Sequence, residues 1–229
     1  MINRYSREKI TQFWTQKHKI QKWLEIELAV LEKQVELGLL PKKIFKNIKE
    51  TAEADIRKVA RREKITHHDV AAFVDVLQAS VGENGKFIHM GLTSSDILDT
   101  ANAIIIQEVT DVIKQDIENL LDILYGLADR YKYVPTIGRT HGIHAEPTTL
   151  GLKFAGFYSE FKRDLERLEN AAENMRYGKI SGPVGNFSLI DFEVEKYVCE
   201  KFGLKPEPVS TQIVPRDRYA EYIVSLAFI

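Results

Sequence analysis

Residues 93–127 read TSSDILDTANAIIIQEVTDVIKQDIENLLDILYGL, and this stretch decides the fold. Apolar residues recur in it at intervals of three and four, at Ile97, Ala101, Ile105, Val109, Ile113, Ile117, Leu120, Leu124 and Leu127. That spacing predicts one helix of about 30 residues, roughly 45–50 Å long. Such a helix exceeds what a small domain needs, so we expect it to belong to a bundle shared between subunits.

The residues before this stretch predict a compact domain of shorter helices. Apolar residues at helical spacing predict a first helix from about Arg7 to Leu37, and Gly38 provides its stop signal. Three shorter helices are expected after it, from Pro41 to Glu50, from Asp55 to Lys64 and from Thr66 to Val81. We assign residues 1–92 to this N-terminal helical domain.

Two more long helices are expected after the central one. The first runs from Pro147 to about Met175, and the second begins near Arg216. Between them we expect a Gly- and Ser-rich loop over residues 178–191, with room for a short strand, and a helix from Asp191 to Phe202. The class is all-α, and residues 93–229 form the first part of a long-helix bundle domain. The last helix meets no stop signal before Ile229, so we expect a truncated bundle and no C-terminal domain in this fragment.

The composition limits the classes of function. The 229 residues include 32 basic and 33 acidic side chains without a long run of one sign, which argues against a general nucleic-acid or membrane-surface binder. Cys199 is the only cysteine, which fits a reducing compartment, and we expect it to pack as a small core residue. No apolar run approaches the ~18–20 residues of a membrane span, and the N-terminus has no secretory signal. We therefore expect a cytoplasmic protein.

Histidines concentrate in the connections between the predicted helices and at the starts of these helices. Five of the six lie there: His67, His68, His89, His141 and His144. Histidine is the side chain whose charge changes most readily near neutral pH, so this distribution suggests chemistry. The densest segment is residues 139–147, RTHGIHAEP, a polar connection that ends in a proline able to open the next helix.

Two predicted helix starts share one pattern. Thr66-His67-His68-Asp69 and Thr93-Ser94-Ser95-Asp96 each place a carboxylate three residues after a threonine, which is the spacing of a capping box with threonine as the N-cap. The same helix starts offer backbone N–H groups and a positive dipole end to an anion. The capping and the anion-binding interpretations are compatible.

A metal site is the alternative for the polar segments. Its ligands would come from His67, His68, His141, His144 and Glu146. Histidines three apart can share a helix face, but Gly142 and Pro147 disfavour a helix there. We predict that no metal is bound.

These segments together resemble the adenylosuccinate lyase family of the fumarase/aspartase superfamily. The motifs that carry the resemblance are Arg4-Tyr5-Ser6, Thr66-His67-His68-Asp69-Val70, Thr93-Ser94-Ser95-Asp96, residues 139–149 and Ser210-Thr211-Gln212. They occur in family order along the whole chain. Gly142-Ile143 follows the Thr-His pair where fumarases and argininosuccinate lyases carry Leu-Gln, which favours the purine branch.

The resemblance implies a carbon–nitrogen lyase of purine nucleotide biosynthesis. The expected reaction is a β-elimination that releases fumarate from adenylosuccinate, giving AMP, and from succinyl-aminoimidazole-carboxamide ribotide. The resemblance makes His141 the general acid and His68 the histidine that assists it. No cofactor is implied, and the expected assembly is a homotetramer in which three subunits build each active site.

The same resemblance implies the residues that bind the anionic nucleotide substrate. Arg4 and Tyr5 are expected at the nucleotide end, His89 near the phosphate, and Thr93 and Ser94 at a carboxylate. The remaining expected contacts are His67, Asp69, Thr140 and Gln212.

One family feature is expected beyond residue 229. This is the flexible signature loop (Gly-Ser-Ser, then Met-Pro and Lys-Asn), whose serine is considered the general base. We therefore expect the 229 residues alone to lack lyase activity. Two alternatives stay open: another superfamily lyase with argininosuccinate- or carboxymuconate-type substrates, and a non-catalytic helical oligomerisation scaffold.

Overall fold

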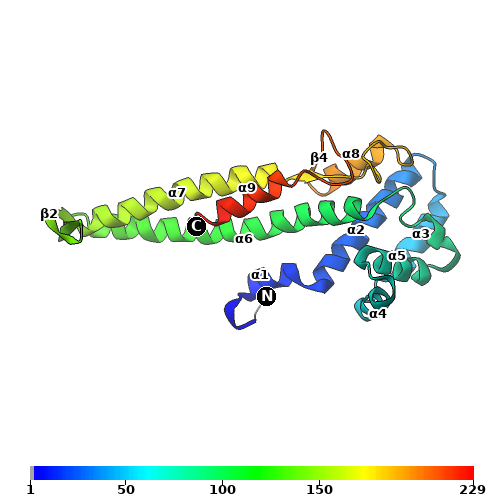
Figure 1. Ribbon diagram of the computed structural model, residues 1–229, viewed down its shortest axis with the longest axis horizontal. Coiled ribbons are helices and arrows are strands. Elements are labelled where there is room, and N and C mark those ends of the chain that lie inside the picture. Colours follow the sequence, from blue (N-terminus) through cyan, green and yellow to red (C-terminus); the bar gives the residue numbers. More distant parts are fainter. Residues whose placement is uncertain (1–2) are drawn as a thin grey trace. The chain divides into compact units, whose positions relative to one another are not determined.

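A computed structural model describes residues 3–229, and helices dominate them (Figure 1). The chain divides into two compact units. The first takes in the residues up to Glu108 together with Met175–Arg216, and the second consists of Val109–Asn174 and Asp217–Ile229. Residues 1 and 2 of the predicted N-terminal domain lie outside the described residues, and the domain boundary between residues 92 and 93 stays a prediction.

The first unit gathers the shorter helices around one apolar core. Its helices are η1 (Asn3–Tyr5), α1 (Glu8–Thr11), η2 (Gln12–Trp14), α2 (Gln16–Glu36), α3 (Lys42–Thr51), α4 (Ile56–Thr66), α5 (Asp69–Ser80), η3 (Gly82–Phe87), the first part of α6 (Ser94–Arg130) and α8 (Phe192–Lys201). Strands β3 (Tyr177–Gly178) and β4 (Lys205–Pro206) form a short parallel pair.

The core of the first unit confirms the apolar pattern. Trp23 of α2 meets Phe73 of α5 edge to face, with ring centroids 5.4 Å apart, and both side chains are buried. Cys199 of α8 is fully buried, as expected for a small core residue, and burial raises the pKa of its thiol. The thiol therefore remains protonated and serves packing.

The prediction of one helix from Arg7 to Leu37 is wrong. The chain leaves the helical conformation at Thr15, where φ is −75° and ψ is 149°, and α2 starts only at Gln16. The hydroxyl of Thr15 accepts the His18 N–H at 3.2 Å and thereby caps α2. Apolar spacing continues across this break, so periodicity alone hides it.

The second unit consists of two long helices, one shorter helix and one β-hairpin. It contains α6 from Val109 onward, β1 (Pro135–Thr140), β2 (Ile143–Thr149), α7 (Leu150–Asn174) and α9 (Asp217–Leu226). Helix α9 packs along α7, and the hairpin joins α6 to α7 (Figure 1). Lys114 of α6 pairs with Glu169 of α7 at 2.6 Å, and the hydroxyls of Thr110 and Tyr222 lie 2.8 Å apart. The long central helix is confirmed, with 37 residues.

Two expected helix ends in this unit are wrong. Pro147 does not open α7, because it lies within β2 and pairs with Ile137 of β1. The helix begins at Leu150, and the Thr149 hydroxyl accepts the Leu152 N–H at 3.2 Å. Helix α9 ends at Leu226, before the last residue described. The all-α class is nevertheless confirmed, since strands among the described residues form just two short pairs.

Glu195 is a carboxyl group in the core of the first unit. Its side chain is buried within α8, and its Oε2 accepts the Ile180 N–H at 2.8 Å. Burial raises the pKa of Glu195 to about 7, although the Ile180 N–H and the Lys179 charge act in the opposite direction. Glu195 therefore changes charge within the physiological range.

The raised pKa of Glu195 predicts a pH-dependent stability. From its ordinary value of 4.5 up to about 7, the folded state keeps a proton that the unfolded chain has released. This contribution to the free energy of unfolding is fully present below that window and is lost as the pH rises through it, by up to about 3 kcal/mol. Glu195→Gln stays neutral and should remove this part of the dependence in urea unfolding at about pH 5 and about pH 8.

Glu193→Gln is the matched control, because Glu193 lies on the exposed side of the same helix. It should keep the wild-type dependence on pH. A Glu195→Gln protein that loses as much stability as the wild type between the two pH values would contradict the assignment.

Candidate active site

The first predicted site segment lies where α4 ends and α5 begins. Helix α4 runs through Thr66 and closes with His67 in the left-handed conformation, at a φ of 50°. Helix α5 begins at Asp69, and its N-cap is His68, whose Nδ1 accepts the Ala71 N–H at 3.3 Å. The capping box predicted with Thr66 as the N-cap is therefore wrong. The Thr66 hydroxyl instead bonds to the backbone of His68.

The cap determines which nitrogen of His68 is available. Because Nδ1 accepts a hydrogen bond, the ring proton of the neutral imidazole resides on Nε2. Half of the side chain is exposed. His68 can thus present Nε2–H as a donor to a bound group while the helix holds the ring in place.

Asp69 is tied to a neighbouring helix. Its Oδ2 accepts a hydrogen bond from Nζ of Lys19 in α2 at 3.1 Å, and its Oδ1 accepts the Val70 N–H at 2.8 Å. Burial acts to raise the pKa of the Asp69 carboxyl, but these donors outweigh it and the pKa is lowered. The carboxylate stays ionised and fixes the start of α5 to α2, a role for Lys19 that the sequence did not indicate.

The second segment begins at His89 and leads into α6. His89 also adopts a positive φ, of 64°. Its ring Nδ1 lies 2.6 Å from Oε1 of Glu27, and its backbone N–H donates to Oε2 of the same carboxylate at 3.1 Å. Glu27 is buried in α2 and thus holds both the ring and the backbone of His89.

The sequence analysis did not predict a role for Glu27, although its position among apolar residues indicated one. Glu27 falls on the same apolar stripe of α2 as Ile20, Trp23 and Leu31, all of which are buried. A carboxylate on an apolar stripe must find a partner in the interior, because an unpaired buried charge is very costly. Here the partner is His89.

The start of α6 has the carboxylate half of the predicted capping box. The Thr93 N–H donates to Oδ2 of Asp96 at 2.8 Å, and the helix begins at Ser94. Thr93 and Ser94 are partly exposed. The first turn of a helix this long presents N–H groups and the positive end of the dipole, which favour a carboxylate or phosphate.

Gln212 lies in an exposed segment that is fixed on both sides. Before it, the hydroxyl of Ser210 lies 2.7 Å from that of Ser181. After it, the Val214 N–H donates to the buried carboxylate of Asp99 at 2.9 Å. The segment that carries Gln212 is therefore anchored to α6 and to the Gly- and Ser-rich loop.

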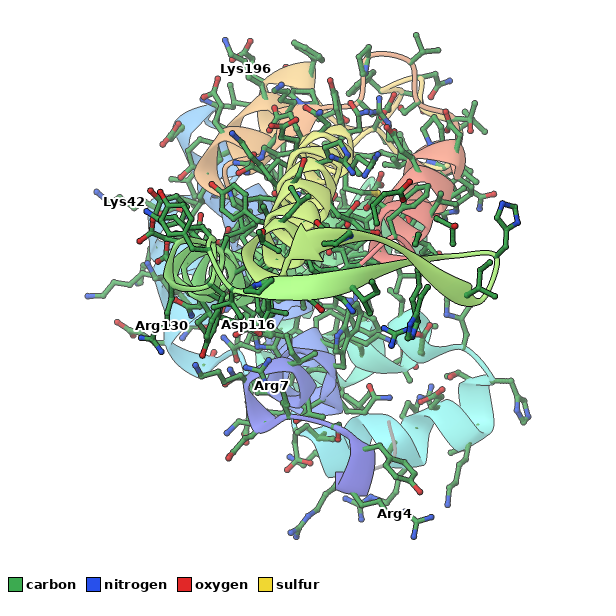
Figure 2. The ribbon with its side chains drawn as sticks, turned by 90° about the vertical axis from the view of Figure 1, so that its left-hand side faces the viewer. Arg4, Arg7, Lys42, Asp116, Arg130 and Lys196 are labelled. Atoms are coloured by element: carbon green, nitrogen blue, oxygen red, sulfur yellow. The ribbon has the colours of Figure 1, made fainter. Side chains whose placement is uncertain are left out.

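Thr140 and His141 lie at the turn of the β1–β2 hairpin, in the second unit. Thr140 pairs with Ile143, so His141 and Gly142 form a two-residue turn with φ values of 50° and 75°. Positive φ at both central residues is the requirement of a type I′ turn, and glycine satisfies it without strain. The expected polar connection is this hairpin, which the sequence analysis did not predict although the His-Gly pair was a signal for it. Figure 2 shows the hairpin foremost.

Arg4 and Tyr5 lie together in η1. The guanidinium of Arg4 stacks over the Tyr5 ring, 4.8 Å from its centroid. The Tyr5 side chain is 74% exposed. Their place at the nucleotide end of the substrate stays a prediction.

Backbone strain links three of the predicted site residues. The non-glycine residues with positive φ in the described chain are His67, His89, His141 and Phe187. Such conformations are uncommon and cost energy, and they concentrate at functional sites. Three of the four are histidines that the sequence already singled out.

Residues 3–229 contain neither a cluster of metal ligands nor a helix able to span a membrane. Within residues 3–229, His, Cys, Asp and Glu side chains nowhere form a group of three or more that could hold a metal ion. In the same residues, every helix is too short or too polar to cross a membrane.

Comparison with known proteins identifies the class. A family model described as Lyase matches residues 1–229, and the chain belongs to this lyase family. Among solved structures, the fumarate lyase of Mesorhizobium sp. BNC1 superposes with a TM-score of 0.89 at 29% identity, covering 98% of this chain and 55% of that one. The expected fumarase/aspartase-type fold is confirmed.

The resemblance to one branch of the family is confirmed as well. The chain is 48% identical to the adenylosuccinate lyase of Thermotoga maritima and 46% identical to that of Bacillus subtilis, over all 229 residues in both cases. The match covers 53% of each relative, so the chain spans about half the length of the curated relatives it matches.

The capping geometry of His68 predicts how two substitutions of this residue change the stability of the protein. His68→Ala in the full-length protein removes the cap and should lower the free energy of unfolding by about 0.5–2 kcal/mol. His68→Asn also removes the imidazole but supplies a good capping side chain, so it should retain most of that stability. Urea unfolding measures both variants.

Asp55→Ala is the control, since Asp55 caps α4 by accepting the Lys58 N–H at 2.9 Å. It should cost a similar amount. Equal losses for His68→Ala and His68→Asn would show that the imidazole does not serve as the cap.

Proposed function

We propose that the full-length protein containing this chain catalyses the adenylosuccinate lyase reaction. It releases fumarate from adenylosuccinate, giving AMP, and from succinyl-aminoimidazole-carboxamide ribotide in purine nucleotide biosynthesis. The identity of 44–48% to several adenylosuccinate lyases supports this proposal, because it extends over the whole chain.

The observation that carries the mechanism is the placement of His141. A type I′ turn fixes its backbone at the tip of a hairpin, and its side chain is exposed. In the proposed reaction a base removes the proton beside a carboxylate, the C–N bond breaks, and His141 protonates the departing nitrogen. A positioned acid accelerates such a step by about 10²–10⁴. His68 assists through Nε2–H.

The other predicted residues bind the anionic substrate. We assign a substrate carboxylate to Thr93 and Ser94, because the start of α6 offers N–H donors to an anion. His89 is assigned to the phosphate region, since Glu27 holds its ring through Nδ1. The nucleotide end is assigned to Arg4 and Tyr5. The remaining assigned contacts are His67, Asp69, Thr140 and Gln212, and we propose that no cofactor takes part.

We further propose that the protein acts as a cytoplasmic homotetramer assembled through the long helices. Apolar side chains are exposed on each helix of the second unit, such as Ile123 of α6, Leu152 of α7 and Ile223 of α9, each about 60% exposed. Burial between subunits would stabilise these side chains. A lone, buried cysteine is compatible with a reducing compartment.

The general base determines one further part of the proposal, the activity expected of residues 1–229 alone. The family's signature serine loop has no counterpart motif in residues 1–229. We therefore expect no turnover of adenylosuccinate by these residues alone, whereas the full-length protein should be active. Fumarate release, followed by its ultraviolet absorbance, measures both.

His141→Gln tests the proposed acid. In the full-length protein it should lower kcat for adenylosuccinate by about 10²–10⁴. The stability should change little, because the side chain is exposed.

His18→Gln is the control, since His18 pairs with Glu108 outside the predicted site, and it should keep kcat near the wild-type value. Full turnover by His141→Gln would refute His141 as the acid, whereas no turnover by the wild type would favour the helical scaffold. Turnover of argininosuccinate in preference to adenylosuccinate would favour another lyase of the superfamily.

A further inference from the structure

Asp96 and Lys179 form an ion pair in the interior of the first unit. Both side chains are fully buried, and Nζ of Lys179 lies 2.5 Å from Oδ1 of Asp96. Nζ also donates to the carbonyl oxygen of Gly182 at 2.8 Å. A buried pair contributes little net stability, because removing both charges from water offsets their attraction. The role of this pair is therefore inferred from the backbone segments that it joins.

The Asp96 carboxylate joins two separate backbone segments. It accepts the N–H of Thr93, at the start of α6, at 2.8 Å. It also accepts the N–H groups of Ser181 and Gly182, in the Gly- and Ser-rich loop of residues 178–191, at 3.1 and 3.2 Å. With Lys179, four donors occupy its two oxygens, so Asp96 has no capacity left for a substrate.

Thr100 fixes the position of Lys179 along α6. Its Oγ1 accepts the Lys179 N–H at 3.0 Å and donates to the Lys179 carbonyl oxygen at 2.9 Å. Thr100 lies one helical turn after Asp96, on the same face of α6. The loop therefore cannot slide along the helix without breaking hydrogen bonds at two successive turns.

The loop in turn holds the segment that carries Gln212. The hydroxyls of Ser181 and Ser210 lie 2.7 Å apart. Gly185 adopts a φ of 76°, and a Cβ at this position would lie 2.3 Å from the Ser210 carbonyl oxygen. The contact leaves no room for a side chain, so the two segments are closely fitted.

We propose that the Asp96–Lys179 pair positions the part of the site that takes the dicarboxylate end of the substrate. The pair holds the start of α6, with Thr93 and Ser94, against the loop that anchors Gln212. Asp96 and Lys179 are positioning residues, since both are buried and neither touches the substrate. The inference rests on the proposed function and adds to it the interaction that arranges these contacts.

The test uses the full-length protein and two probes that report on different ends of the substrate. Fumarate carries the two carboxylates, and AMP carries the nucleotide without them. Asp96→Asn alone would leave the buried Lys179 charge unpaired and endanger folding. The double variant Asp96→Asn/Lys179→Met neutralises both charges at similar volume.

Calorimetric titration should show selective damage in the double variant. Fumarate should bind roughly 10- to 100-fold more weakly, because the positions of its donors shift, while the Kd for AMP stays within about twofold. KM for adenylosuccinate should rise with the fumarate Kd. If the pair had a purely structural role, the double variant would bind both probes equally more weakly or both as the wild type does. Either result overturns the inference.

Thr100→Val keeps the inference testable if the double variant does not fold. It removes both hydrogen bonds to Lys179 with little change of volume. It should weaken the binding of fumarate more than that of AMP, by a smaller factor than the double variant does. The matched control is Lys33→Met/Glu36→Gln, which removes an ion pair of 3.0 Å on α2 in the same unit. The control should bind both probes as the wild type does.

The outcomes separate this inference from the proposed function. A wild-type protein that binds neither probe and does not turn over adenylosuccinate would refute the proposed function. An active wild type whose Thr100→Val and double variants bind fumarate normally would refute the positioning role alone.

Discussion

The buried carboxylate of Asp96 is the constraint on which the arrangement of the first unit depends. A charge without access to water must have its hydrogen-bonding capacity filled by the protein. Asp96 meets this requirement with Lys179 and with backbone N–H groups from two segments distant in sequence. The electrostatic requirement of one side chain thus dictates where the start of α6 and the Gly- and Ser-rich loop lie.

Local contacts likewise fix the backbone of three histidines. His67, His89 and His141 all adopt a left-handed backbone, which the surrounding structure must stabilise. The end of α4 supports His67, the buried Glu27 carboxylate supports His89, and a two-residue hairpin turn supports His141. A local element of the structure thus fixes the backbone of each of these three histidines.

Much of the fold follows from local signals in the sequence. The apolar spacing of residues 93–127 predicted α6, and Asp55 and Asp191 mark the starts of α4 and α8 as expected of capping residues. The break at Thr15 and the hairpin around Pro147 were missed for a common reason. A threonine is compatible with a helix interior or a cap, and a proline with a helix start or an edge strand, so tertiary contacts decide.

The site was predicted unevenly for a related physical reason. Short polar motifs drew attention to His68, His141 and Thr93, and the family resemblance supplied their expected roles. The supporting residues Lys19, Glu27 and Lys179 were missed, because the contacts that make them important join elements 50 to 83 residues apart in sequence. Periodicity and spacing describe local neighbours and carry no information on such pairs.

Amide hydrogen exchange of the full-length protein tests the central constraint most directly. If Asp96 fixes both segments, the N–H groups of Thr93, Ser181 and Gly182 should exchange slowly, with protection close to that of the core of α6. In Thr100→Val, protection of Ser181 and Gly182 should fall while Thr93 stays protected, since Thr93 directly precedes the helix that carries Asp96. Fast exchange of all three N–H groups in the wild type would contradict the account.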